Sequence, residues 1–296
     1  MVLVDPYGLS ITLPFWNGRI SFGSHRATED RLLSGMPKDI ADIIRGPRPF
    51  ELYDRITLED GQEIRRDEDY GTGLFVYPDG KRFHKKYATQ NLRRSVTWDT
   101  GGMNTSKFEM CQRAQRTMDI SRKQIKHVVC RYQNTPINPW GVGAAIGVVS
   151  VGTNEATDIL QDATVDFNDT CREYKISFQG MNTGHSLGVS TSEAIRQSPE
   201  LQVPSRRKYF GKSVNFGGPT RPIDALNYEA STDAVPYLGM ALRSALEGDD
   251  FAAAAMGKAI IIDTPGFRPD EAHAFFGVPY QWALYDAIYN KGALNE

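Results

Sequence analysis

Two regions of the chain differ in how hydrophobic and polar residues follow one another. Residues 1 to about 135 are polar and rich in turns and charge. Within them, residues 56–64 alternate around a central Asp-Gly, and residues 74–83 repeat that pattern around a second one. Asp-Gly between alternating segments is a strong hairpin signal, because both residues tolerate the backbone angles of a tight turn. We therefore predict two β-hairpins here, and a helix over residues 106–118.

From about residue 125 the pattern changes to short apolar runs that are separated by helical stretches. The runs predict strands at 128–132, 144–151, 175–178, 213–216, 225–228 and 259–263, and the stretches between them predict helices at 158–174, 187–197, 235–246, 250–256 and 278–289. Strands that are apolar along their whole length and alternate with helices are typical of a mostly parallel sheet covered on both faces. We predict an α/β domain over residues 136–296, preceded by a smaller, hairpin-rich accessory region over residues 1–135.

Composition narrows the classes of partner and cofactor. The chain of 296 residues has 34 basic and 36 acidic side chains, a balance that gives no reason to expect a nucleic acid partner. Cys111, Cys130 and Cys171 are far apart and form no Cys-x-x-Cys pair, which favours a reducing compartment. Neither cysteines nor histidines show the spacing of metal ligands, so we expect no metal and no other cofactor.

No window approaches the roughly 18 consecutive apolar residues that a membrane-spanning helix needs. Residues 1–9 also lack the basic start and apolar core of a secretory signal. We therefore expect the protein to be cytoplasmic in the cell that makes it. If it acts outside that cell, a specialised secretion apparatus would have to deliver it.

A candidate nucleophile lies in Gly184-His185-Ser186-Leu187-Gly188, between a predicted strand and a predicted helix. In such a turn the glycines let strand and helix approach closely, and the serine hydroxyl projects from the top of the sheet. Residues 179–183 separate the obvious strand from the turn, so the strand either runs longer or contains a bulge. The motif resembles the nucleophile elbow of many lipases, and the chain resembles the α/β-hydrolases of the fungal class 3 lipase type over residues 140–285.

This resemblance implies a triad in the chain order serine, acid, histidine. His273 is the one histidine beyond the elbow and is therefore the candidate base. The segment Asp233-Ala234-Val235-Pro236 follows a predicted strand and resembles the Asp-x-Val-Pro of class 3 lipases, with a longer interval after Asn227. Asp233 is the preferred acid. Two other aspartates compete with it: Asp224, which precedes the strand, and Asp263, which ends the last strand.

The resemblance also implies an oxyanion hole. Residues 149–162 resemble the lipase segment that follows the strand before the elbow unit, although Val151 stands where arginine is usual. A glycine, Gly152, ends the predicted strand there, and the N–H of Thr153 could then point at a tetrahedral oxyanion. The N–H of Leu187 would be the second donor.

The first residues carry a second, shorter resemblance. Asp5-Pro6-Tyr7-Gly8-Leu9 is similar to the Asp-Pro-x-Gly-Leu junction that precedes the toxin domain of Rhs-type polymorphic toxins, although it also reads as a simple Asp-Pro turn. A genuine junction would imply a delivered antibacterial effector with an immunity or delivery partner.

Together these patterns predict a serine hydrolase of carboxylic esters, a lipase or phospholipase that acts on lipid or another ester and contacts the membrane surface. The alternative is a non-catalytic binding or structural protein in which Gly-His-Ser-Leu-Gly is an incidental turn. An activated serine would distinguish the two, because only the enzyme has one.

Overall fold

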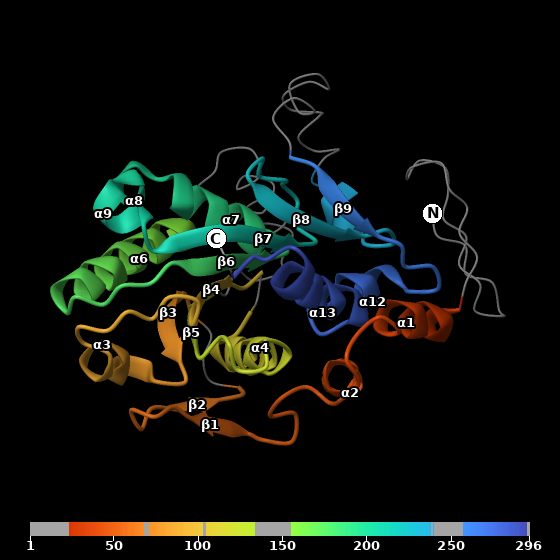
Figure 1. Cartoon of the computed structure of the whole chain (residues 1–296), viewed down its shortest axis with the longest axis horizontal. Helices are drawn as coiled ribbons and strands as arrows, with labels where there is room; N and C mark the ends of the chain where they lie inside the picture. Colours follow the sequence, from red (N-terminus) through yellow and green to blue (C-terminus); the bar gives the residue numbers. More distant parts are fainter. Residues whose placement is uncertain are drawn as a thin grey trace.

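The computed structural model describes residues 24–67, 71–102, 105–133, 155–237, 239 and 257–294. Within this part of the chain, seven strands form one sheet with helices on both of its faces (Figure 1). In spatial order the strands are β3 (Gly73–Tyr77), β5 (His127–Tyr132), β4 (Val96–Thr100), β6 (Gly180–His185), β7 (Phe210–Phe216), β8 (Ala225–Ala230) and β9 (Ala259–Ile262). Six of them are parallel, and β3 runs antiparallel to β5. The predicted α/β fold with a mostly parallel sheet is confirmed.

The two faces of the sheet bury separate clusters of apolar side chains. One cluster joins the sheet to α2 (Lys38–Arg45), α4 (Lys107–Ile120) and α13 (Val278–Tyr285). The other joins it to α6 (Glu155–Glu173), α7 (Leu187–Gln197) and α8 (Pro199–Gln202). The remaining helical segments are α1 (His25–Leu33), η1 (Gly80–Arg82), α3 (Phe83–Lys86), α9 (Pro204–Arg207), α12 (Pro269–His273) and η2 (Asp286–Asn290). In the described part of the chain, no helix combines the length and the apolar character needed to cross a bilayer.

The predicted boundary at residue 135 does not match the sheet. Strands β3, β4 and β5 come from the region predicted to be an accessory, yet they form one side of the same sheet, and β4 lies directly beside β6. Residues 73–132 therefore contribute three strands to the same sheet as the predicted α/β domain. The sequence did not predict the inner strand β4, because Thr97, Asp99 and Thr100 interrupt its apolar pattern, although all three are buried.

Of the two predicted hairpins, the first is confirmed and the second is wrong. Strands β1 (Arg55–Thr57) and β2 (Glu63–Arg65) form a separate antiparallel pair, with Ile56 opposite Ile64. After β3, by contrast, Asp79-Gly80 leads into η1 and α3, because Gly80 takes a positive φ of 60° and the chain turns helical. Strand β3 then pairs with β5 instead of with a neighbour in sequence.

Other predicted elements agree with the structure to within a few residues, including α4, α6, α7 and the strands β5, β7, β8 and β9. The strand predicted at 175–178 is wrong, since only Ser177 forms an isolated bridge and the strand β6 begins at Gly180. The predicted strand at 144–151 and the predicted helix at 250–256 lie outside the described residues, as do Thr153 and the Asp-Pro junction at residues 5–9.

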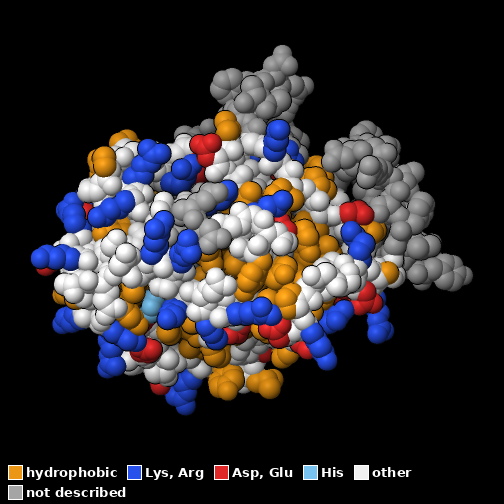
Figure 2. Space-filling model, in the orientation of Figure 1, with side chains coloured by type: hydrophobic (Ala, Val, Ile, Leu, Met, Phe, Trp, Pro, Cys, Tyr) orange, Lys and Arg blue, Asp and Glu red, His pale blue; other side chains and the backbone are white. Residues whose placement is uncertain are grey.

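Charge is unevenly distributed over the surface, although the totals nearly cancel. Figure 2 shows basic side chains gathered at the end of this face that carries α3, α6 and α9. Exposed basic residues of this end include Lys81, Arg82, Lys85, Lys175, Arg207 and Lys208. Basic side chains therefore cluster at this end of the molecule, although the net charge of the whole chain is close to zero.

Candidate active site

Ser186 lies in a strained turn between β6 and α7. Strand β6 ends at His185, α7 begins at Leu187, and Ser186 between them has φ 56° and ψ −131°. A non-glycine residue in such a conformation costs on the order of 1–3 kcal/mol and persists only where the surrounding structure fixes it. Here the Ser186 N–H donates to the carbonyl of Phe216 at 3.0 Å. The strand before Ser186 is therefore β6, which begins later than the strand predicted at 175–178 and runs directly into the turn.

The glycines on either side of Ser186 are required by close packing. A Cβ at Gly184 would lie 2.9 Å from both the carbonyl oxygen of Gly188 and the Cα of Val189. A Cβ at Gly188 would run into the backbone of β4 at Thr100. The spacing of Gly184, Ser186 and Gly188 thus lets α7 lie against the sheet, as the mechanical account of this turn requires.

The structure brings the predicted base and the preferred acid together. His273 ends α12, and its Nδ1 lies 2.9 Å from Oδ2 of Asp233, which follows β8 by a short loop. Asp233 is completely buried, and its Oδ1 accepts the N–H of Val235 at 2.9 Å. The competing aspartates lie elsewhere. Asp224 precedes β8 and so lies at the opposite edge of the sheet from Ser186, and the Asp263 side chain is 60% exposed near Arg31.

Asp233 has a third partner that sequence reasoning missed. The hydroxyl of Tyr280, on α13, donates to the same oxygen, Oδ2, that faces His273. Tyr280 is fully buried, and burial followed by the nearby Asp233 charge raises the pKa of its phenol well above the usual value. The phenol therefore stays protonated and remains a donor. Nothing in the local sequence around Tyr280 signals this contact, since 47 residues separate the pair.

His185 holds the candidate base from the other side. Its Nε2 lies 2.7 Å from the carbonyl oxygen of His273, so Nε2 must carry the proton, because a carbonyl can only accept. Burial, followed by the charges of His273 and Arg113, holds the pKa of His185 well below its usual value. His185 thus remains a neutral donor and fixes the backbone of His273 without competing for the serine proton.

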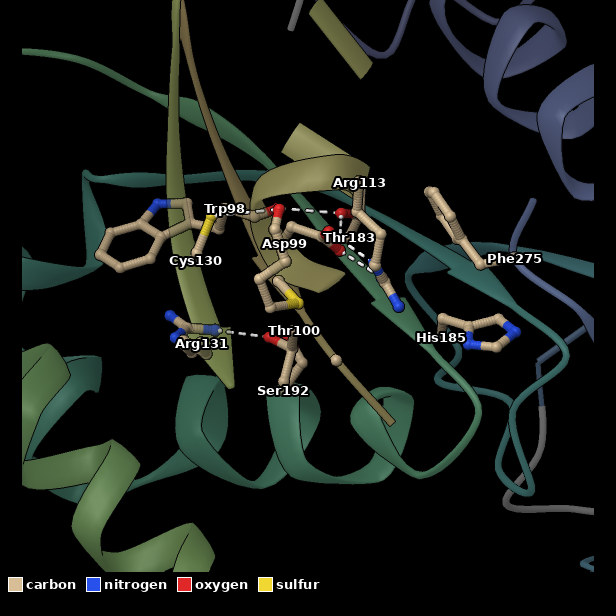
Figure 3. Close-up of polar contacts among 12 residues, drawn as sticks. Trp98, Asp99, Thr100, Arg113, Cys130, Arg131, Thr183, His185, Ser192 and Phe275 are labelled. Atoms are coloured by element: carbon tan, nitrogen blue, oxygen red, sulfur yellow. Dashed lines mark hydrogen bonds and ion pairs between the residues drawn. The ribbon is translucent and has the colours of Figure 1, made fainter. Parts of the chain in front are cut away.

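A buried ion pair lies beneath this part of the site (Figure 3). Asp99, on β4, accepts two hydrogen bonds from the guanidinium of Arg113 at 2.9 and 2.7 Å, and a third from the Thr183 hydroxyl at 2.8 Å. The guanidinium of Arg113 packs on the ring of Phe275, 4.0 Å from its centroid. Phe275 in turn contacts the ring of His185, at 5.7 Å between centroids. The packing of His185 is thereby connected to β4.

A second buried guanidinium has no acidic partner in the part of the chain that the structure describes. Arg131, at the end of β5, donates to the Thr100 hydroxyl at 3.2 Å and lies over the ring of Trp98 (Figure 3). Burial lowers the pKa of Arg131 to about 9. Asp99 thus pairs with Arg113, whereas hydroxyl and amide oxygens and the Trp98 ring hold the guanidinium of Arg131.

The loop after β4 lies against Ser186, a feature that the sequence analysis missed. A Cβ on Gly102 would be 2.9 Å from the Cβ of Ser186 and 3.4 Å from its hydroxyl oxygen. The preceding Gly101 is fixed on both sides, since its N–H donates to Arg131 and its carbonyl accepts from Gln133, each at 2.9 Å. The signal in the sequence is the pair Gly101-Gly102 directly after residues 96–100, which form β4.

Within the described ranges, no group of three or more histidine, cysteine, aspartate or glutamate side chains could hold a metal ion. Cys111, Cys130 and Cys171 are free thiols and all are buried. Burial raises the pKa of the Cys130 thiol well above its usual value, which makes it a poor nucleophile.

Comparison with known proteins adds little to this geometry. No family model matches the chain, and no curated protein matches it. Among solved structures, vibralactone cyclase superposes with a TM-score of 0.35 at 12% sequence identity, covering 99% of this chain and 96% of that chain. The assignment of function therefore rests on the strained serine, its neighbours and the fold that positions them.

Proposed function

We propose that this protein is a serine hydrolase of carboxylic esters in which Ser186 is the nucleophile, His273 the general base and Asp233 the acid that orients it. The observation that carries the proposal is the strained backbone of Ser186 at the carboxyl end of the central parallel strand β6. The contact between the buried Asp233 carboxylate, in the loop after β8, and His273, at the end of α12, supports it. Strain of this kind is typical of a nucleophile elbow, and an incidental turn would have no reason to keep it.

The hydrogen bond between His273 and Asp233 defines the direction of proton transfer. If Nδ1 carries a proton and donates to Asp233, Nε2 is left free to accept the proton of the Ser186 hydroxyl. The serine oxygen then bonds to the ester carbonyl carbon, and the carbonyl oxygen takes the negative charge. Collapse of this intermediate breaks the bond to the alcohol, which leaves with the proton from His273. Water repeats the sequence on the acyl-enzyme and releases the acid.

We propose two sources of stabilisation for the oxyanion. The N–H of Leu187, the first residue of α7, is one donor, because the first amides of a helix have no partner within it. The second side is the loop at Gly101 and Gly102, which approaches the serine closely. The sequence placed this second side at Thr153, and Thr153 stays a prediction. Removing one such donor typically costs about 2.7–4 kcal/mol of barrier.

The finer class is a lipase or phospholipase, proposed from the lipase-like elbow and the lipase-like acid segment at residues 233–236. Acting on lipid would bring the carboxyl edge of the sheet, where Ser186 lies, to a membrane surface. The proposal that the chain is a delivered toxin rests on the residues of the Asp-Pro junction alone. An immunity or delivery partner belongs to that proposal.

Hydrolysis of p-nitrophenyl butyrate and p-nitrophenyl octanoate by the full chain tests the proposed function. We expect turnover that Ser186→Ala removes by several orders of magnitude, because members of a triad act as a unit. Ser177→Ala is the matched control, since Ser177 is exposed at the opposite edge of the sheet and should leave turnover unchanged. Faster turnover of the octanoate ester would favour a lipase. Equal turnover by Ser186→Ala and the wild-type chain would contradict the proposal.

A further inference from the structure

Two donors share one oxygen of the buried aspartate. Oδ2 of Asp233 faces both Nδ1 of His273 and the hydroxyl of Tyr280, while Oδ1 is held by a backbone amide. The Tyr280 hydroxyl also lies 3.4 Å from the N–H of Ala230, which donates to it. The Tyr280 oxygen thus accepts a hydrogen bond from the Ala230 amide, while its hydroxyl proton is donated to Asp233.

The neighbouring strand is shaped around this contact. Gly217, which follows β7, has a positive φ of 57°. A Cβ at this position would lie 2.5 Å from Oδ2 of Asp233 and would also overlap the Tyr280 hydroxyl. Glycine is therefore needed here for two reasons, backbone conformation and space, and both preserve the tyrosine–aspartate hydrogen bond.

We propose that Tyr280 is a positioning residue that fixes the Asp233 carboxylate and withdraws part of its negative charge from His273. This inference rests on the proposed function, since it concerns the protonation of the proposed base. A carboxylate that accepts a second strong hydrogen bond stabilises an adjacent imidazolium less. Tyr280 would thus keep His273 unprotonated, and able to accept the serine proton, at a lower pH than Asp233 alone would allow.

Other charged and titratable groups face the Asp233–His273 pair. His185 faces His273 as a neutral donor, and Arg113 lies behind Phe275 with its charge paired to Asp99. The remaining groups around the pair are Asp270 and Glu271 on α12, with the nearby Arg268, and Tyr237 together with the Arg221–Glu229 ion pair on the Asp233 side. Tyr280 donates a hydrogen bond directly to the Asp233 carboxylate, so it is the side chain to perturb.

The test is the rate at which a fluorophosphonate probe labels the chain as a function of pH, because labelling needs the unprotonated base and no knowledge of the substrate. In Tyr280→Phe the acid limb of the rate profile should move to higher pH by about 0.5–1 unit, since the lost hydrogen bond returns charge to the face of Asp233 that His273 contacts. The labelling rate at the alkaline plateau should fall but stay measurable.

Tyr228→Phe is the matched control. Tyr228 is also fully buried and also donates to a carboxylate, but its acceptor is Oδ2 of Asp286 at 2.7 Å and not Asp233. This variant should lose stability and leave the acid limb in place. Replacing Tyr280 alone with 3-fluorotyrosine keeps the packing and makes the phenol a stronger donor, so the limb should move to lower pH even if Tyr280→Phe folds poorly.

The outcomes separate this inference from the proposed function. A wild-type chain that is never labelled, or a Ser186→Ala variant labelled as fast as wild type, would overturn both. If the wild-type chain is labelled but the acid limb stays in place in Tyr280→Phe, the role of Tyr280 alone is overturned. If the phenylalanine variant does not fold, an unmoved acid limb in the fluorotyrosine protein has the same meaning. If the acid limb of the labelling profile shifts equally in Tyr228→Phe, the shift comes from the loss of a buried hydroxyl in general and not from the hydrogen bond to Asp233.

Discussion

Replacing Gly102 with alanine tests whether the loop after β4 is part of the site. The added Cβ would lie 2.9 Å from the Cβ of Ser186, whereas two carbon atoms pack at about 3.5–4.0 Å. Either the loop or the serine must therefore move by about an ångström, and a misplacement of that size at reacting groups can cost roughly a hundredfold in rate. We expect Gly102→Ala to lower ester turnover about a hundredfold.

The loss should be chemical and not a failure to fold. Gly102 has no positive φ angle that would exclude alanine, so the expected destabilisation is that of modest overpacking, about 1–3 kcal/mol. Turnover and urea unfolding would be measured for the variant and for Gly35→Ala, whose added Cβ would meet nothing within 4 Å. Near wild-type turnover by folded Gly102→Ala would refute the placement of this loop at the site.

Further predictions concern four aspartates. Asp233→Asn should lower turnover at least about a hundredfold, because it disturbs the tautomer of the base, as in other triads. Asp224→Asn, at the opposite edge of the sheet, should leave turnover nearly unchanged. A larger loss of turnover in Asp224→Asn than in Asp233→Asn would contradict the strand assignment. Asp99→Asn should destabilise the fold by about 3–5 kcal/mol in urea unfolding, because it leaves the buried charge of Arg113 without its partner; a loss below about 1 kcal/mol would be inconsistent with that. Burial alone would raise the pKa of Asp79, but hydrogen bonds from His127 and Lys86 outweigh burial, so the pKa is lowered on folding. The ionised Asp79 therefore stabilises the fold above the ordinary aspartate pKa, and this stabilisation is lost as the pH falls below it. Asp79→Asn should flatten the loss of stability on the acid side.

The sequence was informative where function depends on local geometry. The elbow could be recognised because Gly184, Ser186 and Gly188 impose one backbone path, and the order of the chain then pointed to Asp233 and His273. The structure brings those two side chains into contact, while their catalytic roles stay a prediction. The parallel sheet could be recognised because its strands are separated by amphipathic helices.

The sequence was less informative where burial depends on distant partners. Strand β4 lies inside the sheet between β5 and β6, yet Asp99 gives it the pattern of an exposed segment, because the sequence does not show that Arg113 and Thr183 satisfy the carboxylate. Missing that strand also hid the glycine loop after it and moved the domain boundary to residue 135. The contact of Tyr280 with Asp233 was hidden for the same reason, since no periodic pattern links α13 to the loop after β8.

Peptide mapping of the fluorophosphonate adduct tests the central claim most directly. The full chain would be labelled, digested and analysed by mass spectrometry, with a His273→Ala sample treated in parallel. We predict a single adduct on Ser186 that forms far more slowly without the base. An adduct on another serine, or no adduct on a folded chain, would contradict the assignment of Ser186 as the nucleophile.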